Sequence, residues 1–182
     1  MAAVLTLAGC GDEPTPPLPA DICQTAGTAL LAQLAPGVRP VAQVEDHGQY
    51  DLDRRCNLEG DIDRNDIALI VHRYPKCEQV EELTTCDLDP AEDNQKNYAS
   101  QCAGEQKLAG QGKGAYSEPP GLGQQACQRV ESQPNETDVE LLVRNGGDQI
   151  NVVYRGFDGR LTAKNGVAGA QKLARTLLAR LK

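Results

Sequence analysis

The stretch VELLVRNGGDQINVVYR, residues 139–155, decides the fold class of this chain. Two largely apolar runs flank Asn145-Gly146-Gly147-Asp148, and the Asn-Gly pair suits a turn with positive φ. The pattern predicts a β-hairpin with one apolar face, because side chains alternate between the two faces of a strand. That face takes alternate residues from both strands: Val139, Leu141, Val143, Ile150, Val152 and Tyr154.

An amphipathic helix is predicted directly after the hairpin, over residues 166–181. The opposite side of this segment is basic. We interpret it as a solvated face whose late cations suit the helix dipole, rather than as a membrane-binding surface. The apolar residues of the helix recur at helical spacing: Val167, Ala170, Ala174, Leu177 and Leu181.

A second helix and a second hairpin are predicted near the N-terminus. Asp21 is a suitable cap for a helix over residues 22–35, and Pro36 is a suitable end. Residues 38–46 and 50–58 predict two short paired strands.

The middle of the chain combines one clear strand with a long segment of different character. Residues 67–74 are largely apolar and predict a buried strand. Residues 76–126 are too long for an ordinary loop and predict an irregular insertion held by disulfides, with a short helix around 91–108. The fold class is α+β: an antiparallel sheet with an N-terminal and a C-terminal helix packed on one face, as a single domain over residues 21–182.

Composition excludes several classes of protein. The 182 residues are 40% hydrophobic and 24% charged, which is typical of one globular domain, and no apolar run reaches the roughly 18 residues that a membrane span needs. The chain has no Trp, one Phe and five Tyr, and its formal net charge is -8. We therefore expect no nucleic-acid partner, since such proteins use basic surfaces and aromatic stacking.

The N-terminus has the features of a lipid-anchored protein. Residues 1–10, MAAVLTLAGC, resemble a signal-peptide remnant that ends in a bacterial lipobox, with Cys10 as the residue to be diacylated. Residues 11–20 form a Pro-rich tether that spans about 30 Å when extended. Two acyl chains anchor a protein stably, so we expect the domain on the outer face of the plasma membrane, with the membrane as one partner.

The remaining cysteines are even in number, which predicts three disulfides in an oxidising compartment. Sequence alone allows 15 pairings of six cysteines. No Cys-x-x-Cys is present, which disfavours zinc-ribbon and thioredoxin-like chemistry. The six candidates are Cys23, Cys56, Cys77, Cys86, Cys102 and Cys127.

Taken together, these segments resemble the small secreted lipoproteins of actinobacteria that carry a domain of unknown function, and they are similar to extracellular sensor domains of some bacterial Ser/Thr kinases. The resemblance covers roughly residues 21–182 and implies a disulfide between Cys23 and Cys56. It implies no established reaction. Its motifs are the lipobox, the Cys-bearing first helix, Cys56 followed by the strand that ends Arg73-Tyr74-Pro75, the segment 121–126, the hairpin and the closing Ala/Leu/Arg helix.

One acidic segment has the spacing of a calcium loop. Asp61, Asp63 and Asn65 stand at alternate positions, as oxygen ligands of Ca²⁺ do. The sixth position of such a loop is Asp66 instead of Gly, and the twelfth is His72 instead of Glu. We therefore favour an acidic turn and expect no metal.

No cofactor site or catalytic set is predicted. The segment GLGQQA, residues 121–126, matches a dinucleotide fingerprint, but residues 117–120 include two prolines and cannot form the central strand that this motif needs. We interpret the segment as a turn that leads into the hairpin region. His47 and His72 are the only histidines, and no nucleophile with a base and an orienting group can be assembled around them.

The sequence therefore predicts a lipid-anchored, extracytoplasmic, sensor-like domain that is not an enzyme and binds an unknown protein or small molecule. One alternative is a cell-envelope hydrolase or transferase that uses carboxylates the sequence does not reveal. Two converging carboxylates in a pocket, one with a raised pKa, favour that alternative. Another alternative is a calcium-dependent adhesion module.

Overall fold

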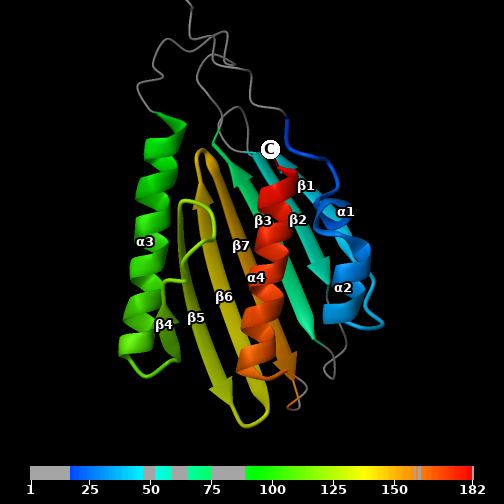
Figure 1. The fold of residues 1–182 in the computed structure, drawn as a ribbon, viewed down its shortest axis with the longest axis vertical. Helices are drawn as coiled ribbons and strands as arrows, with labels where there is room; N and C mark the ends of the chain where they lie inside the picture. The colour runs from blue at the N-terminus through cyan, green and yellow to red at the C-terminus, as the bar shows by residue number, and fades with distance from the viewer. Residues whose placement is uncertain are drawn as a thin grey trace, which may run out of the picture.

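The computed structural model describes residues 17–46, 52–58, 65–74, 89–157, 159 and 161–181. The expected α+β class is confirmed, with helices on both sides of one antiparallel sheet (Figure 1). Within the described residues, no helix is both long enough and apolar enough to cross a membrane.

Seven strands form the sheet, in the order β1-β2-β3-β7-β6-β5-β4, and every neighbouring pair is antiparallel. The chain builds one half of the sheet from β1 to β3 and the other half from β4 to β7. Pairing of β3 with β7 joins the two halves. The strands are β1 (Val41–Asp46), β2 (Leu52–Leu58), β3 (Asp66–Arg73), β4 (Ala115–Ser117), β5 (Gln125–Gln133), β6 (Glu136–Asn145) and β7 (Asp148–Phe157).

Three helices cover one face of this sheet: α1 (Ile22–Ala26), α2 (Thr28–Leu34) and α4 (Ala163–Arg180). The fourth helix, α3 (Pro90–Gly110), packs on the other face and lies at the β4 edge of the sheet in Figure 1. Three of the helices begin after a capping residue, whose side-chain oxygen accepts a hydrogen bond from a backbone N–H of the first turn. The capping residues are Asp21, Asp89 and Thr162.

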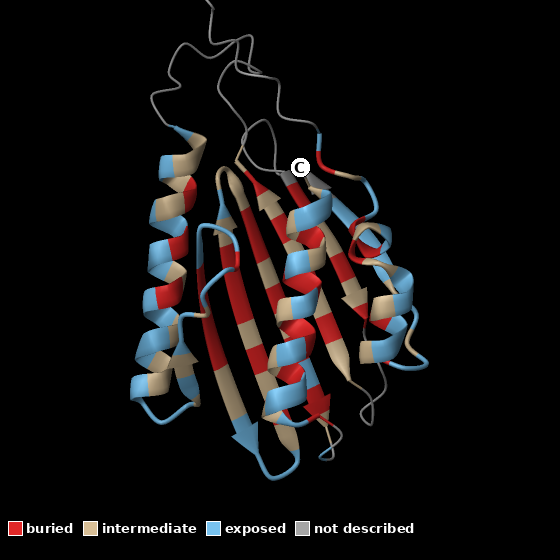
Figure 2. Cartoon of the chain, viewed as in Figure 1, coloured by how far each residue is buried: buried red, intermediate tan, exposed pale blue. Residues whose placement is uncertain are grey.

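The main core lies between the sheet and the helices α1, α2 and α4. The hairpin predicted over residues 139–155 has the expected register: Val139 pairs with Tyr154, Leu141 with Val152 and Val143 with Ile150. All six side chains are buried, as the red bands along β6 and β7 show (Figure 2). Helix α4 turns its buried residues to this face and its exposed ones to solvent, so the prediction of an amphipathic closing helix is confirmed.

The predicted helix over residues 22–35 is two short helices instead of one. Gly27 separates α1 from α2 with φ of 97°, a value that interrupts a right-handed helix and that glycine adopts at little cost. The first helix places Cys23 beside β2, where it forms a disulfide with Cys56. The pairing that the family resemblance implied is thus present.

The described part of the predicted insertion is more regular than expected. Helix α3 has 21 residues, and a disulfide between Cys102 and Cys127 ties it to β5. Residues 121–124 form a turn that enters β5, as predicted for that segment. Cys77 and Cys86 lie outside the described residues, so the third predicted disulfide stays a prediction.

Candidate functional site: the second face of the sheet

The second face of the sheet, on the α3 side, is only partly covered by the described elements. Helix α3 packs on β4, β5 and β6 through a small apolar cluster of Tyr98, Cys102, Cys127, Leu142 and Tyr116. No described helix or strand packs over the same face of β1, β2, β3 and the far end of β7. We call this uncovered part the open face.

Apolar and charged side chains are arranged in a simple pattern on the open face. Ala68 and Ile70 of β3 and Val153 of β7 lie side by side at its centre, since Ala68 pairs with Val153 across the two strands. All three are half-buried, although the side chains of the other face of β3 are fully buried. Charged and amide side chains surround this centre: Asp53, Arg55, Asn57, Asp66, His72 and Arg155.

Two hollows lie on this side of the sheet. One, of about 370 Å³, is lined on the open face by Asn57, Asp66, Ala68, Val153 and Arg155. The other, of about 280 Å³, lies between α3 and the sheet, and its lining includes Gln101, Gly104, Glu105, Glu140, Leu142 and Asn151. Glu140 pairs with Val153 across β6 and β7, so the two hollows border neighbouring positions of one surface.

A histidine and an aspartate form the part of the rim that lies near the C-terminal end of β3. His72 Nδ1 lies in hydrogen-bond contact with Asp53 Oδ1, and the two residues are direct partners on β3 and β2. Arg55 NH2 is 3.6 Å from the second oxygen of Asp53. The ring of Tyr74 packs edge-on against the imidazole at 4.3 Å, and its hydroxyl accepts a hydrogen bond from Asn97 of α3. These contacts hold the imidazole in one orientation and connect the rim to α3.

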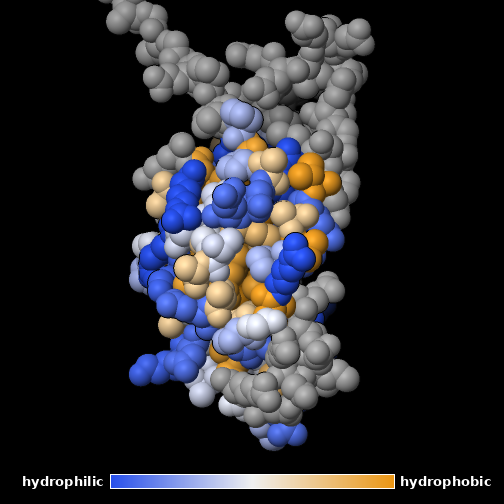
Figure 3. Space-filling model, turned by 90° about the vertical axis from the view of Figure 1, so that its right-hand side faces the viewer, coloured by the Kyte–Doolittle hydropathy of each residue, from blue (hydrophilic) through white to orange (hydrophobic). Residues whose placement is uncertain are grey.

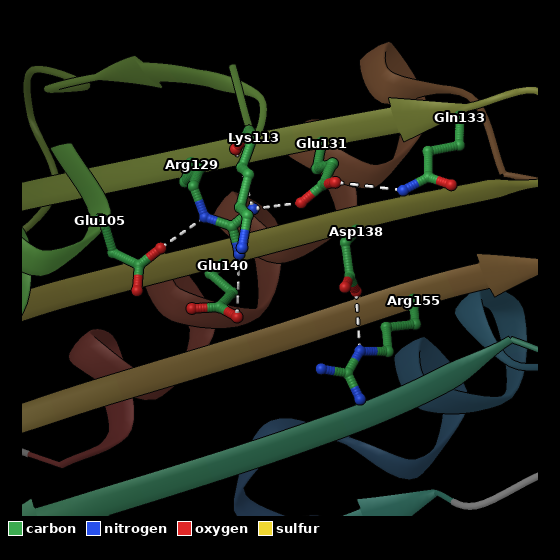
Figure 4. A network of polar contacts seen from close by, with 8 residues as sticks. All are labelled: Glu105, Lys113, Arg129, Glu131, Gln133, Asp138, Glu140 and Arg155. Atoms are coloured by element: carbon green, nitrogen blue, oxygen red, sulfur yellow. Dashed lines mark hydrogen bonds and ion pairs between the residues drawn. The ribbon is translucent and has the colours of Figure 1, made fainter. Parts of the chain in front are cut away.

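Arg129 is the centre of a polar network under α3 (Figure 4). Its Nε donates to Glu105 Oε2 at 2.6 Å, its NH1 to Glu131 Oε2 at 2.8 Å, and its NH2 to Glu140 Oε1 at 3.3 Å. NH1 also donates to the backbone oxygen of Lys113 at 3.1 Å. The Arg129 side chain is 8% exposed, so these are the contacts of a nearly buried guanidinium.

Local structure explains why these groups converge. Arg129 follows Cys127 by two residues on β5, so both side chains point to the α3 side of the sheet, and Arg129 pairs directly with Glu140 of β6. Glu105 follows Cys102 by three residues on α3, which places it on the same side of the helix as the disulfide. The disulfide therefore positions Glu105 over Arg129.

Glu140 and Glu131, two of the carboxyl groups around Arg129, have pKa values shifted in opposite directions. Burial raises the pKa of Glu140, and the neighbouring charge and hydrogen bond of Glu105 raise it further. The pKa of Glu131 is lowered, first by a hydrogen bond from Gln133 and then by Arg129. Glu140 therefore takes up a proton more readily than an exposed glutamate, first because it is buried and then because Glu105 adds negative charge beside it.

Two tyrosines of the apolar cluster between α3 and the sheet are neutral. Burial, together with the charge of Glu118, raises the pKa of Tyr98 to about 12. Burial and a hydrogen bond to Glu118 raise the pKa of Tyr116 to about 12 as well. Neither phenol ionises near neutral pH, so both act here as packing and hydrogen-bonding groups.

Six of the residues singled out from the sequence lie outside the described part of the chain: Cys10, His47, Asp61, Asp63, Cys77 and Cys86. Asn65 is described, and its amide donates to the backbone oxygen of Leu34 at 3.0 Å and to the Tyr154 hydroxyl at 3.2 Å. Asn65 therefore ties the end of α2 to the sheet. Among the described residues, no group of three His, Cys, Asp or Glu side chains is placed to hold a metal ion.

Sequence reasoning missed Glu105, Arg129 and Glu140. The signal that could have found two of them is the turn at residues 134–135, which makes β5 and β6 a second hairpin. Counting outward from that turn pairs Arg129 with Glu140. No local pattern indicates Glu105, because its place depends on which way the disulfide holds α3.

The edge strand β1 is the other notable surface. Val41 and Val44, 53% and 50% exposed, are the two exposed large apolar residues of the described chain, and both lie on this strand. On the side of the molecule shown in Figure 3, hydrophobic residues form separate areas among hydrophilic ones. This edge therefore differs from the open face, where the apolar centre is continuous across two strands.

Comparisons of this chain with protein-family models, with curated proteins and with solved structures find no match. The functional argument therefore proceeds from the geometry of the open face and of the network under α3.

Proposed function

We propose that this protein is a lipid-anchored extracytoplasmic domain that binds a protein partner through the open face and is not an enzyme. The observation that carries the proposal is the half-buried apolar centre of Ala68, Ile70 and Val153 inside a rim of charged side chains. An apolar centre with a polar rim is the usual composition of a protein-binding surface. The hollow of about 370 Å³ beside Val153 has room for a side chain of the partner.

The rim gives this surface its chemical specificity. Asp66 and Arg155 are direct partners across β3 and β7, and Arg155 Nε also donates to Asp138 Oδ1 at 2.8 Å. Asp53, Arg55 and His72 form the opposite part of the rim. Because both signs of charge alternate around the apolar centre, we expect a partner segment that carries both signs around an apolar side chain.

A cell-envelope hydrolase or transferase is the second candidate, and one observation favours it. Glu105 and Glu140 converge beside a hollow, and the pKa of Glu140 is raised. Against it, Arg129 binds one oxygen of each carboxylate, so both serve first in an ion-pair network. A calcium-dependent adhesion module is the third candidate, and calorimetry at millimolar Ca²⁺ tests it.

Lipid anchoring through Cys10 is part of the proposal. It is supported by the lipobox-like residues 1–10, and the two disulfides fit a domain that folds in an oxidising compartment. Replacing Cys10 with Ala is expected to release the protein from membranes into the medium. Continued membrane retention of Cys10→Ala contradicts the anchor.

Site-specific photo-crosslinking in native membranes tests the partner proposal. A photoreactive amino acid at Val153 is expected to give a discrete adduct with a second protein, because this position lies at the centre of the open face. The matched control carries the same amino acid at Ala179, an exposed position on α4 in the helical layer. Equal labelling at both positions, or no adduct at Val153, refutes the open face as the binding surface.

A further inference from the structure

The hollow of about 280 Å³ between α3 and the sheet has an unusual lining. Glu105 comes from α3, Glu140 from β6 and Asn151 from β7, so hydrogen-bond acceptors approach it from three elements. Apolar surface is also present, because Cys127 and Leu142 line the same hollow. A site of this kind suits a ligand with a polar head and an apolar stem.

The acceptors in this lining are not fully used. Arg129 binds Oε2 of Glu105 and Oε1 of Glu140, and the two carboxyl groups lie close enough to share a hydrogen bond when one of them is protonated. A cationic donor between them can take the place of that proton. Asn151 Oδ1 is buried from solvent and accepts no hydrogen bond from any described residue. A buried carbonyl oxygen without a donor is unfavourable, so the fold leaves at this point an acceptor that a ligand can satisfy.

The charge around the hollow is also unbalanced. Glu105, Glu131 and Glu140 face one nearly buried guanidinium, Arg129, and the exposed Lys113. Asp138 and Arg155, the next charged groups on β6 and β7, neutralise each other through their own ion pair. One negative charge is therefore left in excess beside a partly desolvated hollow.

We propose that this hollow is a binding site for a primary alkylammonium group. The ammonium head has three N–H donors, one each for Glu105, Glu140 and the unpartnered Asn151 Oδ1, and its single charge matches the excess. The methylene stem packs on Leu142 and Cys127. The group is carried either by a small free amine or by a lysine side chain, and the site does not depend on a partner at the open face.

Gly104 provides a way to close the site without disturbing the fold. It lines the hollow from α3, and a Cβ built on it meets no atom within 4 Å. A larger residue there also improves helix propensity, since glycine is unfavourable inside a helix. Gly104→Leu is thus expected to fold at least as well as the parent chain while its side chain occupies the hollow.

Amide NMR of the ¹⁵N-labelled full chain at pH 7.5 tests the proposal. Titration with n-butylammonium is expected to give saturable shifts at Gly104, Glu105, Leu142 and Asn151, whereas 1-butanol gives none. Glu140→Gln and Asn151→Leu are each expected to weaken binding about tenfold, the effect of one charge-assisted or buried hydrogen bond. Gly104→Leu is expected to abolish it, and Glu118→Gln, on an exposed carboxylate outside the hollow, is the control.

The source of the ammonium group is settled by a second titration with N-acetyl-lysine-N-methylamide. Binding of both probes assigns the site to lysine side chains as well as free amines, and binding of n-butylammonium alone assigns it to small amines. Diffuse shifts, shifts unchanged in Gly104→Leu, or displacement of the amine by millimolar Ca²⁺ overturn the proposal.

Discussion

The two faces of this sheet are held by different kinds of interaction. On the face that carries α1, α2 and α4, a large apolar cluster includes Leu31, Leu141, Leu173 and Leu177, each with no exposed surface. On the α3 face, four buried side chains, two of them the cysteines of one disulfide, form a small cluster beside a network of charges. The first face therefore supplies most of the apolar core, whereas the second face holds polar groups in defined positions.

A Leu→Ala substitution is expected to lower the free energy of unfolding by different amounts on the two faces. Leu173→Ala on α4 is expected to lower the free energy of unfolding by about 3–4 kcal/mol, because it leaves a cavity in the main core. Leu108→Ala on the half-buried side of α3 is the matched variant and is expected to cost about 1 kcal/mol. Urea unfolding measures both, and equal losses contradict the distinction between the faces.

Removal of the disulfide under α3 is expected to have the next largest effect. The double substitution Cys102→Ala and Cys127→Ala opens a loop of sequence separation 25, which corresponds to a loss of about 2–4 kcal/mol. Because α3 has few other apolar contacts, its amides are expected to exchange with deuterium much faster, while those of α4 change little. Exchange that accelerates equally in both helices disagrees with this view of α3.

Asn94 is expected to be the most important single polar side chain that attaches α3. Its amide donates to the backbone oxygens of Gly146 at 2.8 Å and Asp148 at 2.9 Å, on the turn between β6 and β7, and the residue has no exposed surface. Asn94→Ala removes the side-chain donor from both carbonyls at a fully buried position and is expected to cost about 1–3 kcal/mol in urea unfolding. Gln106→Ala, at an exposed position on the same helix, is the control and is expected to cost less than about 0.5 kcal/mol.

The first face could be predicted from the sequence because its register and its buried positions depend on residues that are close together in the chain. The register of β6 and β7 follows from a four-residue turn, and the buried side of α4 follows from helical spacing. The position of Gly27 within the predicted helix of residues 22–35 was visible, but the break it makes depends on a backbone angle that glycine permits and does not require.

The second face could not be predicted because its contacts join distant segments. Arg129 and Glu105 are 24 residues apart and meet only after Cys102 pairs with Cys127, one of many pairings that six cysteines allow. The open face likewise needs β3 to pair with β7 across more than half the length of the domain. Such pairings are set by tertiary packing, which single-sequence patterns do not record.

The smallest expected effect, and the one that separates the faces most specifically, is a dependence on pH. The folded-state pKa of Glu140 is raised by burial and by Glu105, so the folded chain binds more protons than the unfolded chain between the two pKa values. The ionised form of Glu140 lowers the stability of the fold, and this cost is fully present above the folded-state pKa. The cost decreases as pH falls through that pKa, because the carboxyl group becomes protonated. Glutamine at this position removes the destabilising charge at high pH and also the stabilisation that protonation gives at low pH.

Glu140→Gln is accordingly expected to be as stable as the parent chain or up to about 1 kcal/mol more stable at pH 7.5, and to lose this advantage by pH 4.5. Urea unfolding at the two pH values measures the difference. Glu136→Gln on the same strand, which lies outside the network of Arg129, is expected to show no such change with pH. A variant of Glu140 that is less stable at pH 7.5 and equal at pH 4.5 means that the ion pair with Arg129 outweighs the burial and repulsion, and that the α3 face carries no excess negative charge.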